Sequence, residues 1–286
     1  MSKRNLWKLL SNVMPELPEV ETIVQGLREP LKDLHVIDAI VRCRQLRWPV
    51  LPQLPELLRT QKILNLQRRG KYVLMKFHTG TLIIHLGMSG RLCLIDSTVM
   101  LKPHDHVDII LSNNLILRYH DPRRFGAIVW TTADPSMHPL LQPLGLEPFD
   151  STFTAEYLSQ KALGRRKAIK SFLMDSHIVV GIGNIYAAEC LYLTKIHPLI
   201  AAGALNLIQY RDLVLIIKQV LLAAISQGGT TIKDFVDGIG NPGNFVKQLQ
   251  VYGRSGQHCY TCQSLLQSIK IGQRATVFCP QCQLFA

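Results

Sequence analysis

The 286-residue sequence lacks several features that define whole classes of protein. No stretch reaches the roughly 18 uninterrupted apolar residues that a membrane-spanning helix needs, so we expect no membrane association. The sequence contains no internal repeat and no low-complexity tract, which argues against repeat architectures and largely disordered chains. The apolar part of residues 1–13 is too broken for a secretory signal. These absences leave a globular protein with ordinary hydrophobic cores.

Acidic residues are the scarcer charge. The chain has 20 Asp and Glu against 32 Lys and Arg, which gives a formal net charge of +12 and a pI of about 9.5. Such an excess predicts a polyanionic partner, with nucleic acid first and an acidic membrane surface second. With 47% hydrophobic residues, a chain of this length can form two domains, each with its own core.

Cysteine is used in two different ways. Three of the seven cysteines are scattered, which suits buried thiols in a reducing cytoplasm better than a disulfide framework; these are Cys43, Cys93 and Cys190. The other four form two Cys-x2-Cys pairs separated by sixteen residues, a spacing that fits a zinc ribbon; these are Cys259, Cys262, Cys279 and Cys282. Four thiolates close the coordination shell, so we expect one structural Zn²⁺. A pair of disulfides is the alternative, and the lack of a secretory signal disfavours it.

The first half of the chain shows a strand pattern. A helix is expected from the Pro15 region to about Leu31, followed by short apolar runs between turn signals. We predict strands over residues 36–42, 62–66, 72–77, 81–86, 92–95, 107–111, 115–119 and 127–131. Eight short strands of this kind predict an antiparallel sandwich or a flattened barrel.

The second half is helical. Four prolines between residues 135 and 148 mark a boundary, and apolar faces of helical period follow over residues 154–163, 167–174, 185–193 and 205–226. We therefore predict an α+β protein with these parts: residues 1–13 as an extension, 14–148 as a β-sandwich domain with flanking helices, 149–250 as a helical domain, and 251–286 as the zinc ribbon. The last part contains no Asp or Glu, so its basic residues are unopposed by carboxylates.

Several motifs recur in an order that carries a family resemblance. The chain reads Pro-Glu-Leu-Pro-Glu-Val-Glu over residues 15–21, and the further motifs are Arg-Arg-Gly-Lys-Tyr at 68–72, His-Leu-Gly-Met-Ser-Gly at 85–90, Asp-Pro-Arg-Arg-Phe-Gly at 121–126 and Gly-Asn-Ile-Tyr at 183–186. Together with the four-cysteine tail, they resemble the bacterial formamidopyrimidine-DNA glycosylase family from residue 14 onward. The resemblance implies a helix–two-turn–helix element in the helical domain.

The resemblance implies that Pro15 is a nucleophile. Proteins of this family begin at the matching proline, whose free secondary amine can attack a sugar carbon and form an iminium. An internal proline nitrogen is a tertiary amide and has no such reactivity. We therefore interpret residues 1–13 as a mis-assigned start, with Glu16 as the acid/base partner of Pro15. Without the resemblance, Pro15 and Pro18 would simply mark the start of a helix. Glu19 and Glu21 could shape the pocket electrostatically, and solvation on the helix surface is the favoured interpretation of both.

Further site residues follow from the same resemblance. Lys71 matches the proton donor assigned to β-elimination, and Arg274 matches an arginine assigned to δ-elimination. Met88 and Phe125 match residues that fill the space left by an everted base, and Arg123 matches the contact to the orphaned partner base. His104, Arg165 and Asn184 match DNA contacts, and Asn184 is also a good N-cap for the helix that follows.

Each of these residues has an alternative structural interpretation. Met88 could fill a gap in the core, Phe125 could anchor a hairpin, and Arg123 could belong to a surface ion pair. The His104-Asp105-His106 cluster is also compatible with a metal site. The basic run at residues 165–170 could be a solvated face, although a polyanionic partner favours phosphate contacts.

The resemblance implies a bifunctional enzyme of base excision repair. It would be a DNA glycosylase for oxidised purines such as 8-oxoguanine and formamidopyrimidines, with an abasic-site lyase activity that cuts by β- and δ-elimination. We expect a cytoplasmic monomer that acts on double-stranded DNA. One alternative is an endonuclease VIII-type enzyme for oxidised pyrimidines, whose N-terminus usually carries Gly at the Leu17 position. The other is a DNA-binding protein without catalysis, if Pro15 is not N-terminal.

Overall fold

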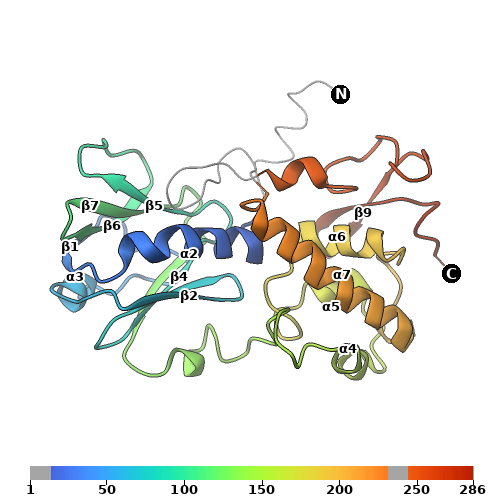
Figure 1. Cartoon of the computed structure of the whole chain (residues 1–286), viewed down its shortest axis with the longest axis horizontal. Helices are drawn as coiled ribbons and strands as arrows, with labels where there is room; N and C mark the ends of the chain where they lie inside the picture. Colours follow the sequence, from blue (N-terminus) through green and yellow to red (C-terminus); the bar gives the residue numbers. More distant parts are fainter. Residues whose placement is uncertain (1–13, 231–243, 286) are drawn as a thin grey trace. The chain divides into compact units, whose positions relative to one another are not determined.

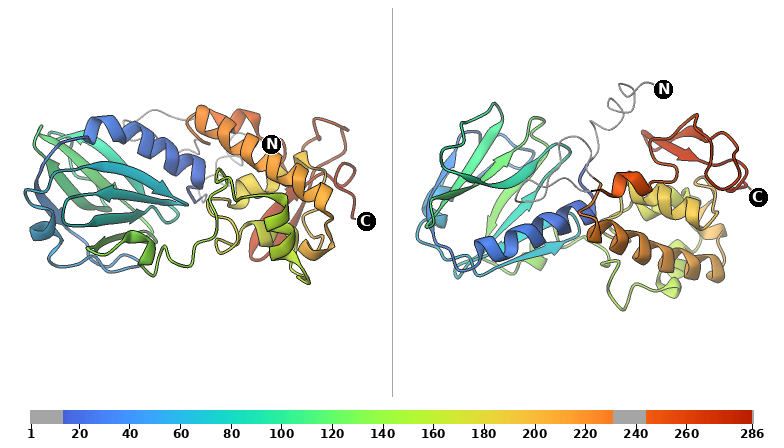
Figure 2. Two further views of the ribbon diagram at one scale, coloured as in Figure 1. Left: turned by 60° about the horizontal axis from the view of Figure 1, so that its bottom comes forward. Right: turned by 45° about the horizontal axis from the view of Figure 1, so that its top comes forward.

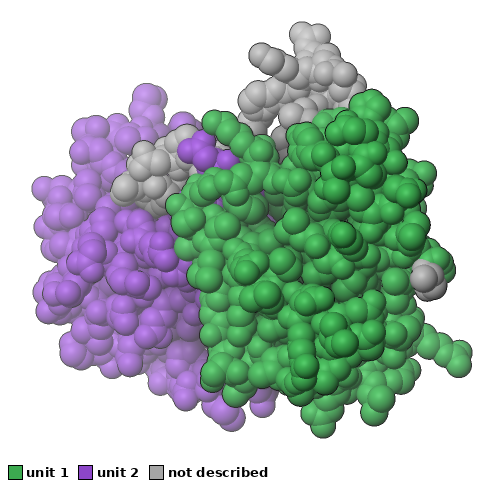
Figure 3. Space-filling model, turned by 45° about the vertical axis from the view of Figure 1, so that its right-hand side comes forward, with its two compact units in different colours: residues 1–9, 143–227, 245–286 green, residues 10–142, 228–244 purple. Residues whose placement is uncertain are grey.

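The computed structural model describes residues 14–230 and 244–285 of the chain, so the predicted extension over residues 1–13 lies outside the described residues. The chain divides into two compact units (Figure 3). The β unit contains residues 14–142 with 228–230 and 244, and the helical unit contains residues 143–227 and 245–285. No helix among the described residues is both long and apolar enough to cross a bilayer.

The β unit is built from one long helix and two antiparallel sheets of four strands (Figure 1). One sheet has the order β1 (Val36–Val41), β6 (Asp105–Leu111), β7 (Leu115–His120) and β5 (Arg91–Asp96). The other has the order β2 (Asn65–Arg69), β3 (Tyr72–Lys76), β4 (Thr81–His85) and β8 (Ala127–Thr131). The remaining elements are α2 (Leu17–Leu31), the short α3 (Leu54–Leu58) and the 3₁₀ turn η1 (Pro135–Met137).

The two sheets share one hydrophobic core, as a sandwich requires. Val73 and Met75 of β3 belong to the same buried cluster as Ile109 of β6 and Leu117 of β7. Helix α2 runs along the strands (Figure 2) and buries an apolar face at helical spacing against that core; the face consists of Val20, Ile23, Val24, Leu27 and Leu31. Burial of each such side chain contributes about 1.5–3 kcal/mol. The predicted α+β class and antiparallel sandwich are confirmed.

The predicted strands agree with the observed ones except at β2. We predicted residues 62–66, whereas the strand spans Asn65–Arg69. The polar sequence Gln-Arg-Arg at the end of β2 lacks the alternation of apolar and polar residues that predicts a strand. The sheet accommodates Arg68 because its guanidinium forms an ion pair with the carboxylate of Glu21 in α2 at 2.8 Å, which compensates the positive charge. The helix α3 was not predicted at all.

The helical unit contains four helices and a terminal hairpin. Its elements are α4 (Ala155–Ala162), α5 (Ile169–Leu173), η2 (Ala202–Ala204), α6 (Asn184–Leu193), α7 (Leu207–Ser226), η3 (Phe245–Gln248), β9 (Gln267–Ile271) and β10 (Arg274–Phe278). Residues Ile185–Tyr192 of α6 are all buried, which makes α6 the central helix of the unit. The four predicted helices are confirmed, with ends that differ by no more than two residues.

Candidate active site and nucleic-acid interface

The start of α2 is buried. Pro15 is buried and Glu16 is 2% exposed. The backbone N–H of Glu16 donates to Oε2 of Glu19 at 2.9 Å. The other oxygen of Glu19, Oε1, accepts hydrogen bonds from the backbone N–H of Thr230 at 2.8 Å and from its hydroxyl at 2.7 Å. The interpretation of Glu19 as a solvated helix residue is therefore wrong, because its carboxylate joins α2 to the chain 211 residues further on.

An ion pair formed by Glu21 links α2 to the β2–β3 hairpin, which carries Lys71. Its Oε2 accepts from Nε of Arg68 in β2 at 2.8 Å, and the two side chains are only 17% and 9% exposed. Glu21 is thus an ion-pair partner and not a solvated residue. Lys71 is half-buried and follows Gly70, whose φ of +57° makes the tight turn between β2 and β3.

The ring of His85, the last residue of β4, packs against the ring of Tyr72, the first residue of β3, with ring centroids 4.6 Å apart. Burial, followed by the positive charges of Lys71 and Arg47, lowers the pKa of His85 to about 4. Its Nδ1 accepts the backbone N–H of Gly87 at 3.0 Å. His85 is therefore neutral at physiological pH and holds the start of the turn that carries Met88.

The structure brings together the three residues that match base-displacing positions. Met88 is half-buried on the turn after β4, and Phe125 is 44% exposed on the loop before β8. The guanidinium of Arg123 lies 4.7 Å from the ring centroid of Phe125. An exposed aromatic ring with a cation over its face, on a loop whose backbone closely approaches Gly87 directly before Met88, matches the chemistry of a base-displacing wedge. Neither Phe125 nor Met88 acts as a fully buried core residue.

His104 is exposed, with a φ of +76°, and its ring lies 6.0 Å from that of His106. The alternative of a metal site at this cluster finds no support within the described residues, where four cysteines form the one group with metal-ligand geometry. Nε2 of His106 instead donates to the carbonyl of Asp121 at 2.8 Å, and Asp105 pairs with His120 at 2.8 Å.

Asn184 lies at the centre of a buried network in the helical unit. It is the first residue of α6, and Gly183 is the N-cap, so the predicted N-cap role of Asn184 is wrong by one position. Its Oδ1 accepts from Nζ of Lys170 at 2.7 Å, and its Nδ2 donates to the carbonyl of Ala275 in β10 at 3.2 Å. Lys170 also donates to the hydroxyl of Thr276 at 2.7 Å and is 1% exposed. Lys170 therefore orients Asn184 and is not part of a solvated basic face.

Arg274 and Arg165 are exposed cations of the helical unit. Arg274 begins β10 and pairs with Ile271 across the hairpin. It lines a cleft of about 450 Å³ together with Lys167 and Lys170. Lys170 is buried there, and Lys167 pairs with Asp175, which also lines the cleft, at 3.0 Å. The exposed guanidinium of Arg274 is therefore the cation of this cleft that can attract phosphate oxygens.

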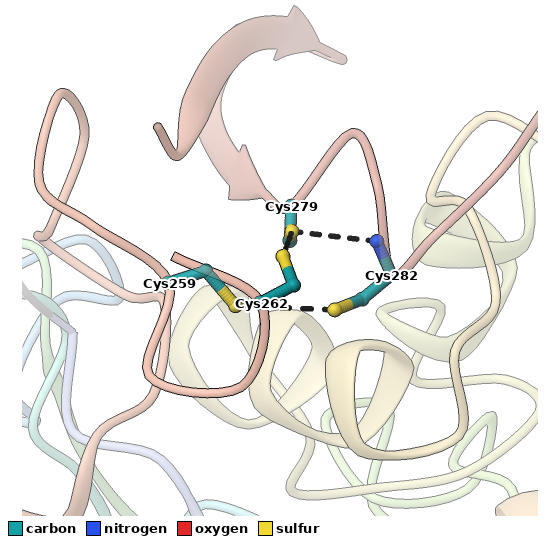
Figure 4. A group of neighbouring side chains, drawn as sticks. All are labelled: Cys259, Cys262, Cys279 and Cys282. Atoms are coloured by element: carbon teal, nitrogen blue, oxygen red, sulfur yellow. Dashed lines mark hydrogen bonds between the residues drawn. The ribbon is translucent and has the colours of Figure 1, made fainter. Parts of the chain in front are cut away.

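The four cysteines converge on one point of the ribbon (Figure 4). A tetrahedral zinc–thiolate centre, with bonds of about 2.3 Å, places its sulfurs about 3.8 Å apart. Here the sulfurs of Cys262 and Cys279 are 3.4 Å apart and those of Cys259 and Cys282 are 3.9 Å apart, and all four lie within 4.8 Å of one another. The donor set therefore fits a closed tetrahedral metal site.

Comparison with known proteins identifies relatives over almost the whole chain. The family models of the formamidopyrimidine-DNA glycosylase N-terminal domain and H2TH domain match residues 14–128 and 144–236. The chain is 48% identical to the formamidopyrimidine-DNA glycosylase of Methylococcus capsulatus over 270 residues, which cover 94% of this chain and 100% of that protein. The enzyme of the same name from Shewanella halifaxensis is 50% identical, with coverage of 94% and 99%. A Lactococcus lactis FPG mutant bound to DNA containing Fapy-dG superposes with a TM-score of 0.89 at 32% identity, covering 94% and 100%.

Proposed function

Because the chain belongs to the formamidopyrimidine-DNA glycosylase family, it is a DNA glycosylase of base excision repair, and we propose that the nitrogen of Pro15 is its nucleophile. The observation that carries the proposal is the 48% identity over the full length of the Methylococcus relative. The family match begins at residue 14, directly before Pro15. The proposal requires a working polypeptide that starts at Pro15, with Met14 removed and residues 1–13 absent, because only then does the proline carry a free secondary amine.

The proposed reaction begins with attack of the Pro15 amine on C1′ of an oxidised purine nucleotide. The damaged base leaves with a proton, the C1′–O4′ bond of the sugar ring opens with a proton delivered to O4′, and an iminium then links the enzyme nitrogen to C1′. Glu16 follows Pro15 in the sequence and is buried, and it serves as the acid/base group. The iminium acidifies the neighbouring sugar proton, and successive β- and δ-eliminations cut the strand on both sides, with Lys71 and Arg274 as the assigned proton-transfer and elimination residues.

The proposed partner is double-stranded DNA that contains a damaged base, bound by one copy of the chain in the cytoplasm. Met88 and Phe125 fill the space of the everted nucleotide, and Arg123 contacts the orphaned base. His104, Arg165 and Asn184 contact the phosphate backbone. Since several cations contribute, binding should weaken steeply with salt, and a flat salt dependence would contradict these contacts.

The proposed metal is a single structural Zn²⁺ held by Cys259, Cys262, Cys279 and Cys282. When bound, it cross-links the two Cys-x2-Cys turns and stabilises the ribbon. The ribbon's own residues then position Arg274, which begins β10 five residues before Cys279. No open coordination position remains for catalysis at such a centre.

Borohydride reduction tests the nucleophile directly, because it traps an iminium as a stable enzyme–DNA adduct. A protein that begins at Pro15 should yield the adduct with duplexes containing 8-oxoguanine, and Pro15→Gly should yield far less, since a primary amine replaces the proline ring. A version blocked at its N-terminus by retained residues 1–13 should yield none. Full lesion cleavage by that blocked version would disprove the mechanism and leave another group as nucleophile.

The substrate class is tested by excision assays. Faster excision of 8-oxoguanine than of thymine glycol supports the oxidised-purine assignment, and the reverse order would support the endonuclease VIII-type alternative.

A further inference from the structure

A single buried carboxylate connects two turns of the β unit, residues 87–90 and residues 122–126. Asp121 is 0% exposed. Its Oδ1 accepts from the hydroxyl of Ser89 in the first turn at 2.7 Å, and its Oδ2 accepts from the backbone N–H of Gly126 in the second turn at 2.9 Å. The two oxygens of one buried side chain thus bond to both turns directly.

Two further contacts strengthen this connection. The backbone N–H of Arg123 lies 3.2 Å from the oxygen of Ser89 and 3.3 Å from Oδ1 of Asp121, so it can donate to both. The hydroxyl of Tyr119 lies 3.3 Å from Oδ2 of Asp121 and 3.1 Å from the carbonyl oxygen of His85, so the two acceptors share its one proton. Burial, together with the nearby Asp121 carboxylate, raises the pKa of Tyr119 well above its usual value, so the hydroxyl keeps the proton that it donates.

The backbones of the two turns also touch. Gly87 has a φ of +60°, and a Cβ atom at this position would lie only 2.5 Å from the carbonyl carbon of Phe125. Only glycine allows the turns to approach so closely. Neither turn can therefore move closer to the other without displacing it.

Asp121 holds a third segment through its main chain. Its N–H donates to the carbonyl of His104 at 3.0 Å, and its own carbonyl accepts from Nε2 of His106 at 2.8 Å. The four proposed DNA contacts of the β unit, Met88, His104, Arg123 and Phe125, thus lie on segments that meet at Asp121.

We propose that Asp121 and Ser89 are positioning residues that join the two turns into one rigid wedge, so that Met88, Arg123 and Phe125 enter the DNA together. This inference rests on the proposed function of those three side chains. Its physical basis is preorganisation: turns that are already fixed lose little conformational freedom on binding, and more of the contact energy remains available to separate stacked bases. Neither Asp121 nor Ser89 needs to contact the DNA.

The test compares Ser89→Ala with Ser89→Thr in the protein that begins at Pro15. The DNA is a duplex with a tetrahydrofuran abasic-site analogue and a 2-aminopurine beside it, whose fluorescence rises when stacking is lost. Ser89→Ala should bind this DNA about 10-fold more weakly, which corresponds to about 1.4 kcal/mol, and should show a smaller fluorescence rise at saturation. Ser89→Thr keeps the hydroxyl and should restore both.

A matched control is Thr152→Ala, which removes a hydroxyl bonded to Asp150 at 2.9 Å on an exposed turn of the helical unit. It should behave as the unsubstituted protein. Thermal unfolding of each variant shows that the fold is retained.

A double-mutant cycle separates positioning from simple loss of stability. In the unsubstituted protein, Met88→Ala and Phe125→Ala should have strongly non-additive effects on the fluorescence rise, because the two side chains act as one body. In the Ser89→Ala background the effects should become nearly additive. Unchanged coupling in that background would overturn the inference while leaving the wedge intact. If Met88→Ala and Phe125→Ala have no effect at all, the proposed wedge itself is wrong, and the inference fails with it.

Discussion

The hydroxyl of Tyr192 in α6 lies 3.2 Å from the sulfur of Cys259, 67 residues further along the chain. The same hydroxyl lies 2.8 Å from the hydroxyl of Thr261, which can donate to it while the tyrosine proton points to the sulfur. A hydrogen bond to a metal-binding thiolate orients the ligand and stabilises its charge. The central helix of the helical unit therefore supports the ribbon that carries the four cysteines.

Tyr192→Phe should accelerate the loss of zinc to a chelator by about 10-fold or more, since removal of such an outer hydrogen bond typically costs that much in metal affinity. The measurement is the rate at which a colorimetric chelator takes up the metal from the purified protein. Tyr210→Phe is the control, because it removes an equally buried hydroxyl that donates to the carbonyl of Ala202 at 2.7 Å, without a contact to a cysteine. Equal rates for the two variants would contradict the role of Tyr192.

Cys279→Ser should reduce the zinc content of the chain to background and abolish tight binding to lesion DNA, because three thiolates no longer close the shell. The β unit has its own core and should remain folded, which circular dichroism can show. Metal analysis and fluorescence anisotropy with labelled duplex measure the two effects. Cys43→Ser replaces a half-exposed thiol of the β unit and serves as control. Full DNA affinity in Cys279→Ser would show that the ribbon is dispensable for binding.

Glu19→Gln should lower the free energy of unfolding by about 1–3 kcal/mol, because the amide NH₂ would face an N–H or hydroxyl donor in a buried site. Lesion cleavage should fall as well, since Glu19 bonds both to the N–H of Glu16 and to Thr230. Urea unfolding and single-turnover cleavage provide the two measurements. Glu29→Gln, at an exposed position of the same helix, should change neither. A fully stable and active Glu19→Gln protein would refute the structural role.

The stability of the β unit should fall as the pH drops from about 6.5 to about 4. Because the pKa of His85 is lowered to about 4 in the folded protein, the unfolded chain binds the extra proton first over this window, and protonation favours unfolding. The contribution of this one group is at most about 3 kcal/mol. His85→Asn keeps an acceptor near the position of Nδ1 and does not titrate, so its unfolding free energy should depend less on pH. Identical pH slopes for the two proteins would contradict this assignment.

Local patterns in the sequence predicted much of the architecture. The alternation of apolar residues located the strands, because a strand half-buried in a sandwich repeats its environment every second residue. β2 was misplaced because Arg68 finds its partner on α2, and no local pattern reveals a distant ion pair. The cysteine spacing predicted a metal-binding group because its ligands come in two short local turns.

The roles of individual side chains were harder to predict. Asp121 begins the motif for which the sequence predicted roles for Arg123 and Phe125, but none for Asp121 itself. Its 0% exposure and its hydrogen bond with Ser89 depend on strand pairing, which the motif does not encode. The sequence predicted Lys170 as part of a basic run at residues 165–170. In the structure Lys170 is buried and donates a hydrogen bond to Thr276, which lies 106 residues away. A charged residue gives no local sign of whether water or a buried partner surrounds it.

The sequence by itself determined the family, the antiparallel class, the helices other than α3, the group of four cysteines and the position of Pro15 at the head of its motif. Each of these follows from residues that are close together in the chain or from motifs in a fixed order. Only the tertiary structure decided which polar side chains are buried and which hydrogen bonds they form. Glu19 bonds to Thr230, Asp121 bonds to residues of two turns, and Tyr192 bonds to Cys259. Ser89 and Asp121 are 32 residues apart, Tyr192 and Cys259 are 67 apart, and Glu19 and Thr230 are 211 apart, so folding alone brings these pairs within hydrogen-bonding distance.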